Sequence, residues 1–250
     1  MSFGFGLDLA GYSTGKSEVA VAQFENGTLQ ITLLGQSPFS RKTKSSNNND
    51  YLGKLEAAEI DAMLKIGNLA VDVPIDLQGL PHTPASPFVW GQTKRPIDFA
   101  LGALAPFADR LGSVVSRFQN ALRFTAASEL LGKKLFETYP SGNLAALGSL
   151  AKGYKGAQQH VNRDQIATFL GLSLSGMSDD ELDAAICAVT AVAPAEFILE
   201  KSDLSEYLFN KTGTEYVDIP RGYRLLRTFL SNKTEVIRSS YDQWMSGEVS

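Results

Sequence analysis

The first forty residues alternate between apolar and polar positions in a pattern that predicts three β-strands. Residues 3–10 are almost entirely apolar, as expected of a buried first strand. Residues 18–24 alternate with a period of two, and residues 29–34 form another apolar run. The Asn-Gly pair within residues 25–27 is typical of a hairpin turn. The chain is therefore expected to begin with an antiparallel meander.

The remainder of the chain alternates between helical and strand patterns. Residues 68–76 and 133–140 are expected to form buried strands, each ended by a proline. Helical patterns occur at residues 51–66, 97–124, 142–150, 163–170 and 179–193, and a short strand pattern occurs at residues 214–219. Strands separated by helices form parallel crossovers, so we expect an α/β fold with a mixed five-stranded sheet. Three antiparallel strands would be followed by parallel ones, with helices flanking the sheet.

The predicted elements fit a single domain that spans residues 1–250. Residues 77–130 would form a helical insertion between the fourth and fifth strands, and their first part is rich in proline. Residues 195–250 would be a C-terminal extension, whose pattern is harder to interpret.

Composition narrows the class of protein. No apolar run is long enough to span a bilayer, and the start of the chain lacks the features of a signal peptide. We therefore expect a cytoplasmic protein with no membrane partner. One cysteine excludes an intramolecular disulfide, and with two histidines it argues against a structural zinc site. The net charge of −4 provides no overall basic field of the kind that attracts nucleic acid.

Five carboxylates occupy unusual positions for acidic residues. Asp8 and Asp72 lie within predicted strands and Glu137 lies at the end of another, although acidic residues are depleted in strands. Asp180 and Asp183 are three residues apart on a helix rich in small residues, so both can point the same way. A buried charge requires a partner. We therefore predict that the five acids form one site.

The neighbouring acids have a simpler interpretation. Ser178 and Glu181 have the spacing of a capping box, and Asp179 suits the positive end of a helix dipole. These three residues are expected to begin the helix and to have no further role.

Clustered carboxylates repel one another, and they remain ionised together only near a compensating cation. Mg²⁺ and Mn²⁺ prefer oxygen ligands, and the chain offers few of the softer ligands that zinc prefers. Two such ions about 4 Å apart would activate a water molecule and stabilise the leaving oxygen of a phosphodiester.

Six short motifs occur in an order that resembles a known superfamily. They are GLDLAG at 6–11, AVDVPIDL at 70–77, KRPIDFAL at 94–101, ETYPSGNLAALG at 137–148, KGYK at 152–155 and DDELDAAICAVTA at 179–191. Together they resemble the ribonuclease-H-like superfamily and, within it, a family of predicted nucleases described as a domain of unknown function.

The resemblance implies a metal-dependent nuclease acting on DNA or RNA. Asp8, Asp72, Glu137 and Asp183 would hold Mg²⁺ or Mn²⁺, with Asp180 as a further catalytic residue and Asp76 as an alternative to Asp72.

Three basic residues of the same motifs are candidates for contact with a substrate phosphate: Lys152, Lys155 and Arg95. Each has an alternative role. The two lysines can be a solvated pair, and Arg95 can form a structural ion pair with Asp98.

Other functions fit parts of the pattern. Residues 10–17 match a loose phosphate-loop motif, but that motif requires a following helix, whereas residues 18–24 predict a strand. Sugar kinases and actin-like ATPases also begin with a G-x-D-x-G strand, so nucleotide phosphate binding is one alternative. A non-catalytic protein that keeps the fold to bind a partner is another.

Overall fold

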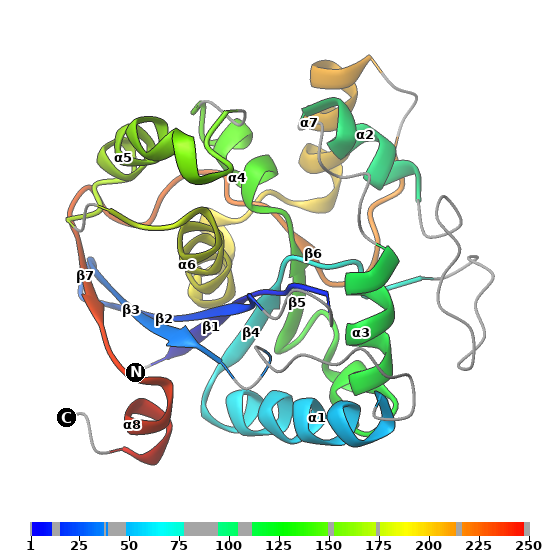
Figure 1. Ribbon diagram of the computed structural model, residues 1–250. Helices are drawn as coiled ribbons and strands as arrows, with labels where there is room; N and C mark the ends of the chain where they lie inside the picture. The colour runs from blue at the N-terminus through cyan, green and yellow to red at the C-terminus, as the bar shows by residue number, and fades with distance from the viewer. Residues whose placement is uncertain are drawn as a thin grey trace.

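The computed structural model describes residues 2–11, 16–37, 39, 49–77, 95–104, 112–149, 153–173, 176–213 and 217–247. Its centre is a seven-stranded sheet with the order β6-β5-β4-β1-β2-β3-β7 (Figure 1). The strands are β1 (Phe3–Asp8), β2 (Glu18–Glu25), β3 (Thr28–Gln36), β4 (Asn68–Val71), β5 (Leu135–Thr138), β6 (Tyr223–Arg224) and β7 (Thr234–Arg238).

The strand directions confirm the predicted fold class. β1, β2 and β3 form an antiparallel meander, whereas β4 pairs in parallel with β1 and β5 pairs in parallel with β4. This is the expected ribonuclease-H-like arrangement of five strands. The predicted strand number was too low, because β6 and β7 add one strand at each edge of the sheet. Both are short pieces of the C-terminal part of the chain, with too few residues for a clear alternation.

The predicted hairpin is confirmed by the backbone. Asn26 and Gly27 both have positive φ angles, 51° and 77°, as the tight turn between β2 and β3 requires. Since residues 18–25 form a strand, the phosphate-loop interpretation of residues 10–17 is wrong. The strand predicted at residues 214–219 is not found at 217–219, and residues 214–216 lie outside the described residues.

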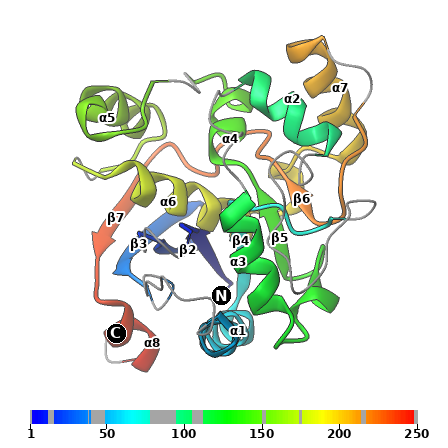
Figure 2. The same cartoon turned by 45° about the vertical axis from the view of Figure 1, so that its right-hand side comes forward.

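Helices cover both faces of the sheet (Figures 1 and 2). They are α1 (Asn49–Ile66), α2 (Pro96–Leu104), α3 (Gly112–Leu122), α4 (Pro140–Ala146), α5 (His160–Phe169), α6 (Asp179–Val192), α7 (Lys201–Thr212) and α8 (Tyr241–Ser246). Successive side chains of β1 point to opposite faces of the sheet. Phe5 and Leu7 pack in the same core as Ile60 of α1 and Phe118 of α3, and α6 lies on the opposite face.

The predicted insertion at residues 77–130 and the predicted extension at residues 195–250 both contribute elements to this architecture. Helices α2 and α3 lie in sequence between β4 and β5, within the expected insertion. The expected extension from residue 195 onward supplies β6 and β7 to the two edges of the sheet. Among the helices described, none is long and apolar enough to cross a membrane.

Helix α6 lies directly on the backbone of β1. A Cβ atom at Gly6 would be 2.0 Å from the carbonyl oxygen of Ala184, and one at Gly4 would be 2.5 Å from that of Ala188. Only glycine therefore permits this approach, and the small residues of α6 complete it from the other side. Asp8 follows Gly6 by two residues, so its side chain lies on the same face of the sheet, toward α6.

Candidate metal centre

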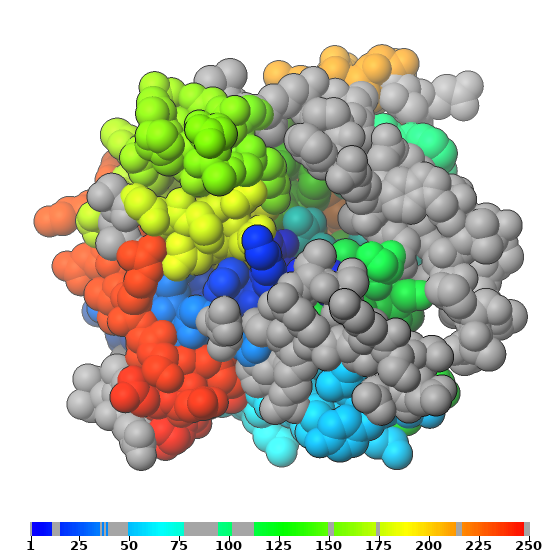
Figure 3. Space-filling model, viewed as in Figure 1, coloured from blue at the N-terminus to red at the C-terminus, as the bar shows by residue number. Residues whose placement is uncertain are grey.

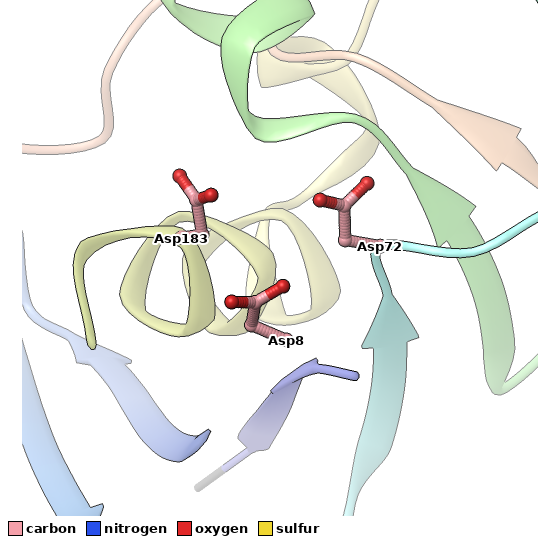
Figure 4. Close-up of side chains that lie close together, drawn as sticks. All are labelled: Asp8, Asp72 and Asp183. Carbon is pink, nitrogen blue, oxygen red and sulfur yellow. The ribbon is translucent and has the colours of Figure 1, made fainter. Parts of the chain in front are cut away.

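Three of the predicted acids meet at one end of the sheet. Asp8 ends β1, Asp72 directly follows β4, and Asp183 lies on α6. One carboxylate oxygen of each lies within 4.8 Å of the others. Figure 4 shows the three carboxylates side by side. The site is therefore assembled from segments that are far apart in the sequence.

Strand register brings the first two acids together. In the parallel pair, Leu7 lies opposite Val71, so the residues that follow them, Asp8 and Asp72, are neighbours. The backbone N–H of Asp72 also donates to the Leu7 carbonyl at 3.1 Å. The close packing of α6 on β1 then places Asp183 beside this pair.

The site combines a buried end with a more accessible one. Asp183 is fully buried, whereas Asp8 and Asp72 are both partly exposed. In the space-filling view, N-terminal residues (blue) lie next to α6 (yellow) in the middle of one face (Figure 3). A recess beside Asp72 is lined by Val73, Pro74 and Tyr139, among others.

Asp183 has a protein partner at each of its carboxylate oxygens. The Tyr154 hydroxyl donates to Oδ1 at 2.8 Å, and the Lys155 ammonium contacts Oδ2. Tyr154 is itself buried and shares a hydrogen bond with the Ser141 hydroxyl at 2.8 Å. Lys155 thus lies within the acidic cluster instead of in solvent, while Lys152 lies outside the described residues.

Burial and mutual repulsion disfavour ionisation of the three-aspartate cluster. Burial raises the pKa of Asp8 well above its usual value, Asp72 and Asp180 raise it further, and Lys155 opposes the rise. Burial also raises the pKa of Asp72 to about 6, where Lys155 opposes the rise and Glu137 adds to it. Among the described residues, Lys155 is the cation whose charge acts on both Asp8 and Asp72, and a bound divalent cation would supply further positive charge.

The donor set suits a hard cation. All three groups offer carboxylate oxygens, which Mg²⁺ and Mn²⁺ prefer. Cys187 on α6 is fully buried, and burial, together with Asp72 and Asp8, raises its pKa well above the usual value. It therefore stays a neutral thiol, the form that does not bind metal well.

Asp180 and Glu18 border the three-aspartate cluster. Asp180 shares a side-chain hydrogen bond with Asp8, and burial and Asp179 raise its pKa. Glu18 lies opposite Asp8 in the β1–β2 ladder. Burial first, then Glu181 and Asp180, raise the pKa of Glu18 to about 7.

Sequence reasoning overlooked both Glu18 and Tyr154. The signal for Glu18 was its place at the start of β2, which the hairpin pairs with Asp8. Within the described residues, its buried Oε2 atom has no hydrogen-bond partner. Tyr154 gave no pattern that distinguishes it from a core aromatic residue, because its role depends on the hydroxyl contact with Asp183.

Glu137 is not one of the three aspartates whose carboxylate oxygens lie within 4.8 Å of one another, but its charge acts on Asp72. Glu137 lies opposite Val71, one residue before Asp72, in the β4–β5 pair, and it lines the same recess as Asp72. There its Oε1 and Oε2 accept hydrogen bonds from Arg95 at 2.5 and 2.9 Å, and the Ile75 amide donates at 3.0 Å.

The Arg95 guanidinium also has several protein partners. Arg95 precedes α2, and its guanidinium also donates to Asp98 Oδ1 at 2.8 Å and to the Asp76 carbonyl at 2.9 Å. The predicted pairing of Arg95 with Asp98 is therefore confirmed, and the guanidinium has buried protein partners in this structure. Asp76 contributes through its backbone here, and its carboxylate accepts from the Arg221 amide at 3.2 Å.

The capping box is confirmed. The Ser178 hydroxyl accepts from the Glu181 amide at 3.0 Å, and the Glu181 carboxylate accepts from the Ser178 amide at 2.8 Å. Asp179 accepts a hydrogen bond from the Gly156 amide at 2.8 Å, which ties the segment carrying Lys155 to the start of α6.

In metal-free buffer, we expect the free energy of unfolding to fall as the pH rises from about 4 to about 7. The pKa values of Asp72 and Glu18 are about 6 and about 7 in the folded protein, above the ordinary carboxyl range. The folded state therefore binds more protons than the unfolded state in this window, and stability present at low pH is lost as these groups ionise.

Urea unfolding in EDTA across this pH range measures the effect, to which the shift of Asp72 contributes roughly 3 kcal/mol. The variant Glu18→Gln removes one of the two groups, so its stability should decline less steeply with pH. Equal slopes for the variant and the wild type would contradict the assignment.

Comparison with known proteins adds one distant likeness. No protein-family model and no curated protein matches the sequence. Among solved structures, the Thermus thermophilus RuvC structure is 14% identical, with 85% of this chain and 97% of that chain covered and a TM-score of 0.37. At this similarity the match assigns no function, so the proposal below rests on the side chains of the site.

Proposed function

We propose that this chain is a metal-dependent nuclease that hydrolyses phosphodiester bonds of DNA or RNA. The observation that carries the proposal is the meeting of Asp8, Asp72 and Asp183 at the ends of β1 and β4 and on α6. Three carboxylates held this close, two of them partly exposed, are the arrangement that binds Mg²⁺ or Mn²⁺ beside a phosphate.

Each residue then has a distinct role. Asp8, Asp72 and Asp183 would hold the metal, which supplies activation of water and stabilisation of the leaving oxygen. Asp180 would orient Asp8 through their shared hydrogen bond, and Tyr154 would orient Asp183. Glu137 and Arg95 would stabilise the end of the sheet that carries Asp72, as positioning residues. The recess next to Asp72 would accommodate part of the substrate.

Calorimetric titration with Mn²⁺ tests the site. We expect saturable binding to the wild type. The affinity of Asp8→Asn should be lower by at least about 100-fold, because the change removes a negatively charged ligand. Asp218→Asn is the matched control, since the Asp218 side chain is 94% exposed and therefore far more solvated than that of Asp8. Absence of Mn²⁺ binding in the wild type, or equal affinity in Asp8→Asn, would refute the proposed site.

Cleavage assays with single-stranded, duplex, hybrid and branched nucleic acids then separate the candidate functions. The proposal predicts Mn²⁺-dependent cleavage of at least one substrate, lost in Asp8→Asn. Binding of nucleic acid without cleavage would favour the non-catalytic alternative. Binding of ATP without any effect on nucleic acid would favour the nucleotide-binding alternative.

A further inference from the structure

Lys155 reaches the site from a segment whose backbone is firmly anchored. Arg163 of α5 donates to the carbonyls of Tyr154 at 2.9 Å and Gly156 at 2.6 Å, and Asp179 accepts from the Gly156 amide. The glycines on either side, Gly153 and Gly156, have positive φ angles of 79° and 95°. These contacts fix the backbone, whereas the four-carbon stem of the lysine is flexible, with its ammonium 5.4 Å from the centre of the Tyr154 ring in this structure.

The Lys155 ammonium lies where a divalent cation would bind. It contacts Oδ2 of Asp183, and its charge acts on Asp8 and Asp72 as well. Oδ1 of Asp183 is taken by the Tyr154 hydroxyl, which is buried with it. The oxygen available to a metal is therefore the one that Lys155 now contacts.

Lys155 also has a way out of the cluster. Its side chain is 32% exposed, whereas that of Asp183 is 0% exposed. The lysine is therefore the more accessible member of this ion pair, and its side chain can move toward solvent while Asp183 stays buried.

We propose that Lys155 is a built-in counter-ion that competes with the metal for Asp183 and must rotate outward when the metal binds. The inference rests on the proposed function and goes beyond it, because it makes metal binding an exchange of cations. In the metal-free protein the ammonium neutralises a buried carboxylate. In the metal-bound protein the same ammonium is released at the mouth of the site, where the phosphate of a substrate would lie.

The variant Lys155→Met tests this exchange, since methionine keeps the apolar stem and removes the charge. We expect it to bind Mn²⁺ about tenfold more tightly than the wild type in calorimetric titration, because no ammonium has to be displaced. We also expect a lower melting temperature in EDTA and a larger rise on addition of Mn²⁺. Lys201→Met is the matched control, because Lys201 is exposed and pairs at 3.3 Å with an exposed aspartate.

Equal or weaker Mn²⁺ affinity in Lys155→Met would overturn the inference and leave the proposed function standing. Binding to Lys155→Met but not to the wild type would support the competition and refute the proposed function, since the lysine would then replace the metal permanently. Absence of binding to both proteins would refute both.

A second measurement uses the wild type, so it does not depend on the folding of a variant. Amine-reactive labelling followed by mass spectrometry reports the accessibility of each lysine. We expect labelling of Lys155 to increase several-fold when Mn²⁺ replaces EDTA, while labelling of Lys201 stays constant. Unchanged or reduced labelling of Lys155 in saturating Mn²⁺ would contradict its release.

Discussion

Gly6→Ala is expected to destabilise the protein by about 3 kcal/mol or more and to lower its melting temperature by roughly 10 °C. The new Cβ would lie 2.0 Å from the Ala184 carbonyl oxygen and 2.2 Å from the Ala188 nitrogen. Both atoms belong to the backbone of α6, so no side-chain rotation relieves the overlap. The helix as a whole has to move away from β1.

The same displacement should weaken the candidate metal centre. Asp183 is carried by α6 and Asp8 by β1, so separating the two elements enlarges the distance between their carboxylates. We therefore expect Gly6→Ala to bind Mn²⁺ less tightly than the wild type even at temperatures where it stays folded. Thermal unfolding and calorimetric titration of the same sample measure the two effects.

Gly11→Ala is the matched control for this prediction. The nearest atom to its new Cβ would be the hydroxyl oxygen of Ser113, at 2.9 Å, which can rotate away. We expect it to change stability by less than about 1 kcal/mol. A similar loss in both variants would show that close packing between α6 and β1 is not the cause.

Arg95→Met is expected to cost about 3–5 kcal/mol of folding free energy. The guanidinium forms ion pairs with Asp98 at 2.8 Å and Glu137 at 2.5 Å, and all three side chains are at most 6% exposed. Burial already raises the pKa of Glu137, and Arg95 opposes that rise. Without the arginine, two carboxylates would remain buried beside each other with no cation between them.

The loss of stability in Arg95→Met should depend on pH. Loss of the guanidinium removes the group that opposes the raised pKa of Glu137, so the variant is least stable where this carboxyl ionises. The destabilisation should therefore be largest near pH 8 and smaller near pH 5. Urea unfolding at both pH values measures it, and a pH-independent loss would point to lost packing instead of unpaired charge.

Two further variants complete the comparison. Arg123→Met removes an exposed arginine that pairs with Asp50 at 3.5 Å, and it should change stability by less than about 1 kcal/mol.

Glu137→Gln should lower stability but leave Mn²⁺ affinity almost unchanged. A loss of Mn²⁺ affinity comparable to that of Asp8→Asn would instead make Glu137 a metal ligand.

The sequence predicted the parts of the fold that depend on local patterns. Period-two alternation and the Asn-Gly turn gave the meander, and the spacing of Ser178 and Glu181 gave the start of α6. The short strands β6 and β7 were missed, because pairing at the edges of an existing sheet forms them and their own sequence carries little pattern.

The candidate site, like the fold, was only partly predictable from the sequence. The placement of Asp8, Asp72 and Asp183 on apolar elements was visible in the sequence, since a charge among buried residues needs a partner. Their meeting at one point, and the different position of Glu137, were not. Strand register and the packing of α2 decide both, because Glu137 lies level with Val71 instead of Asp72 and its carboxylate pairs with Arg95.

The sequence by itself determined the meander, the main helices of the central part and which acids are out of place, because those properties depend on near neighbours along the chain. The tertiary structure alone decided the partners of those acids. Register placed Asp8 beside Asp72 and turned Glu137 toward Arg95, and two glycines allowed α6 to bring Asp183 to the pair. The chain fold also placed the ammonium of Lys155 on Asp183, so the aspartate that the sequence left without a partner has a cation beside it.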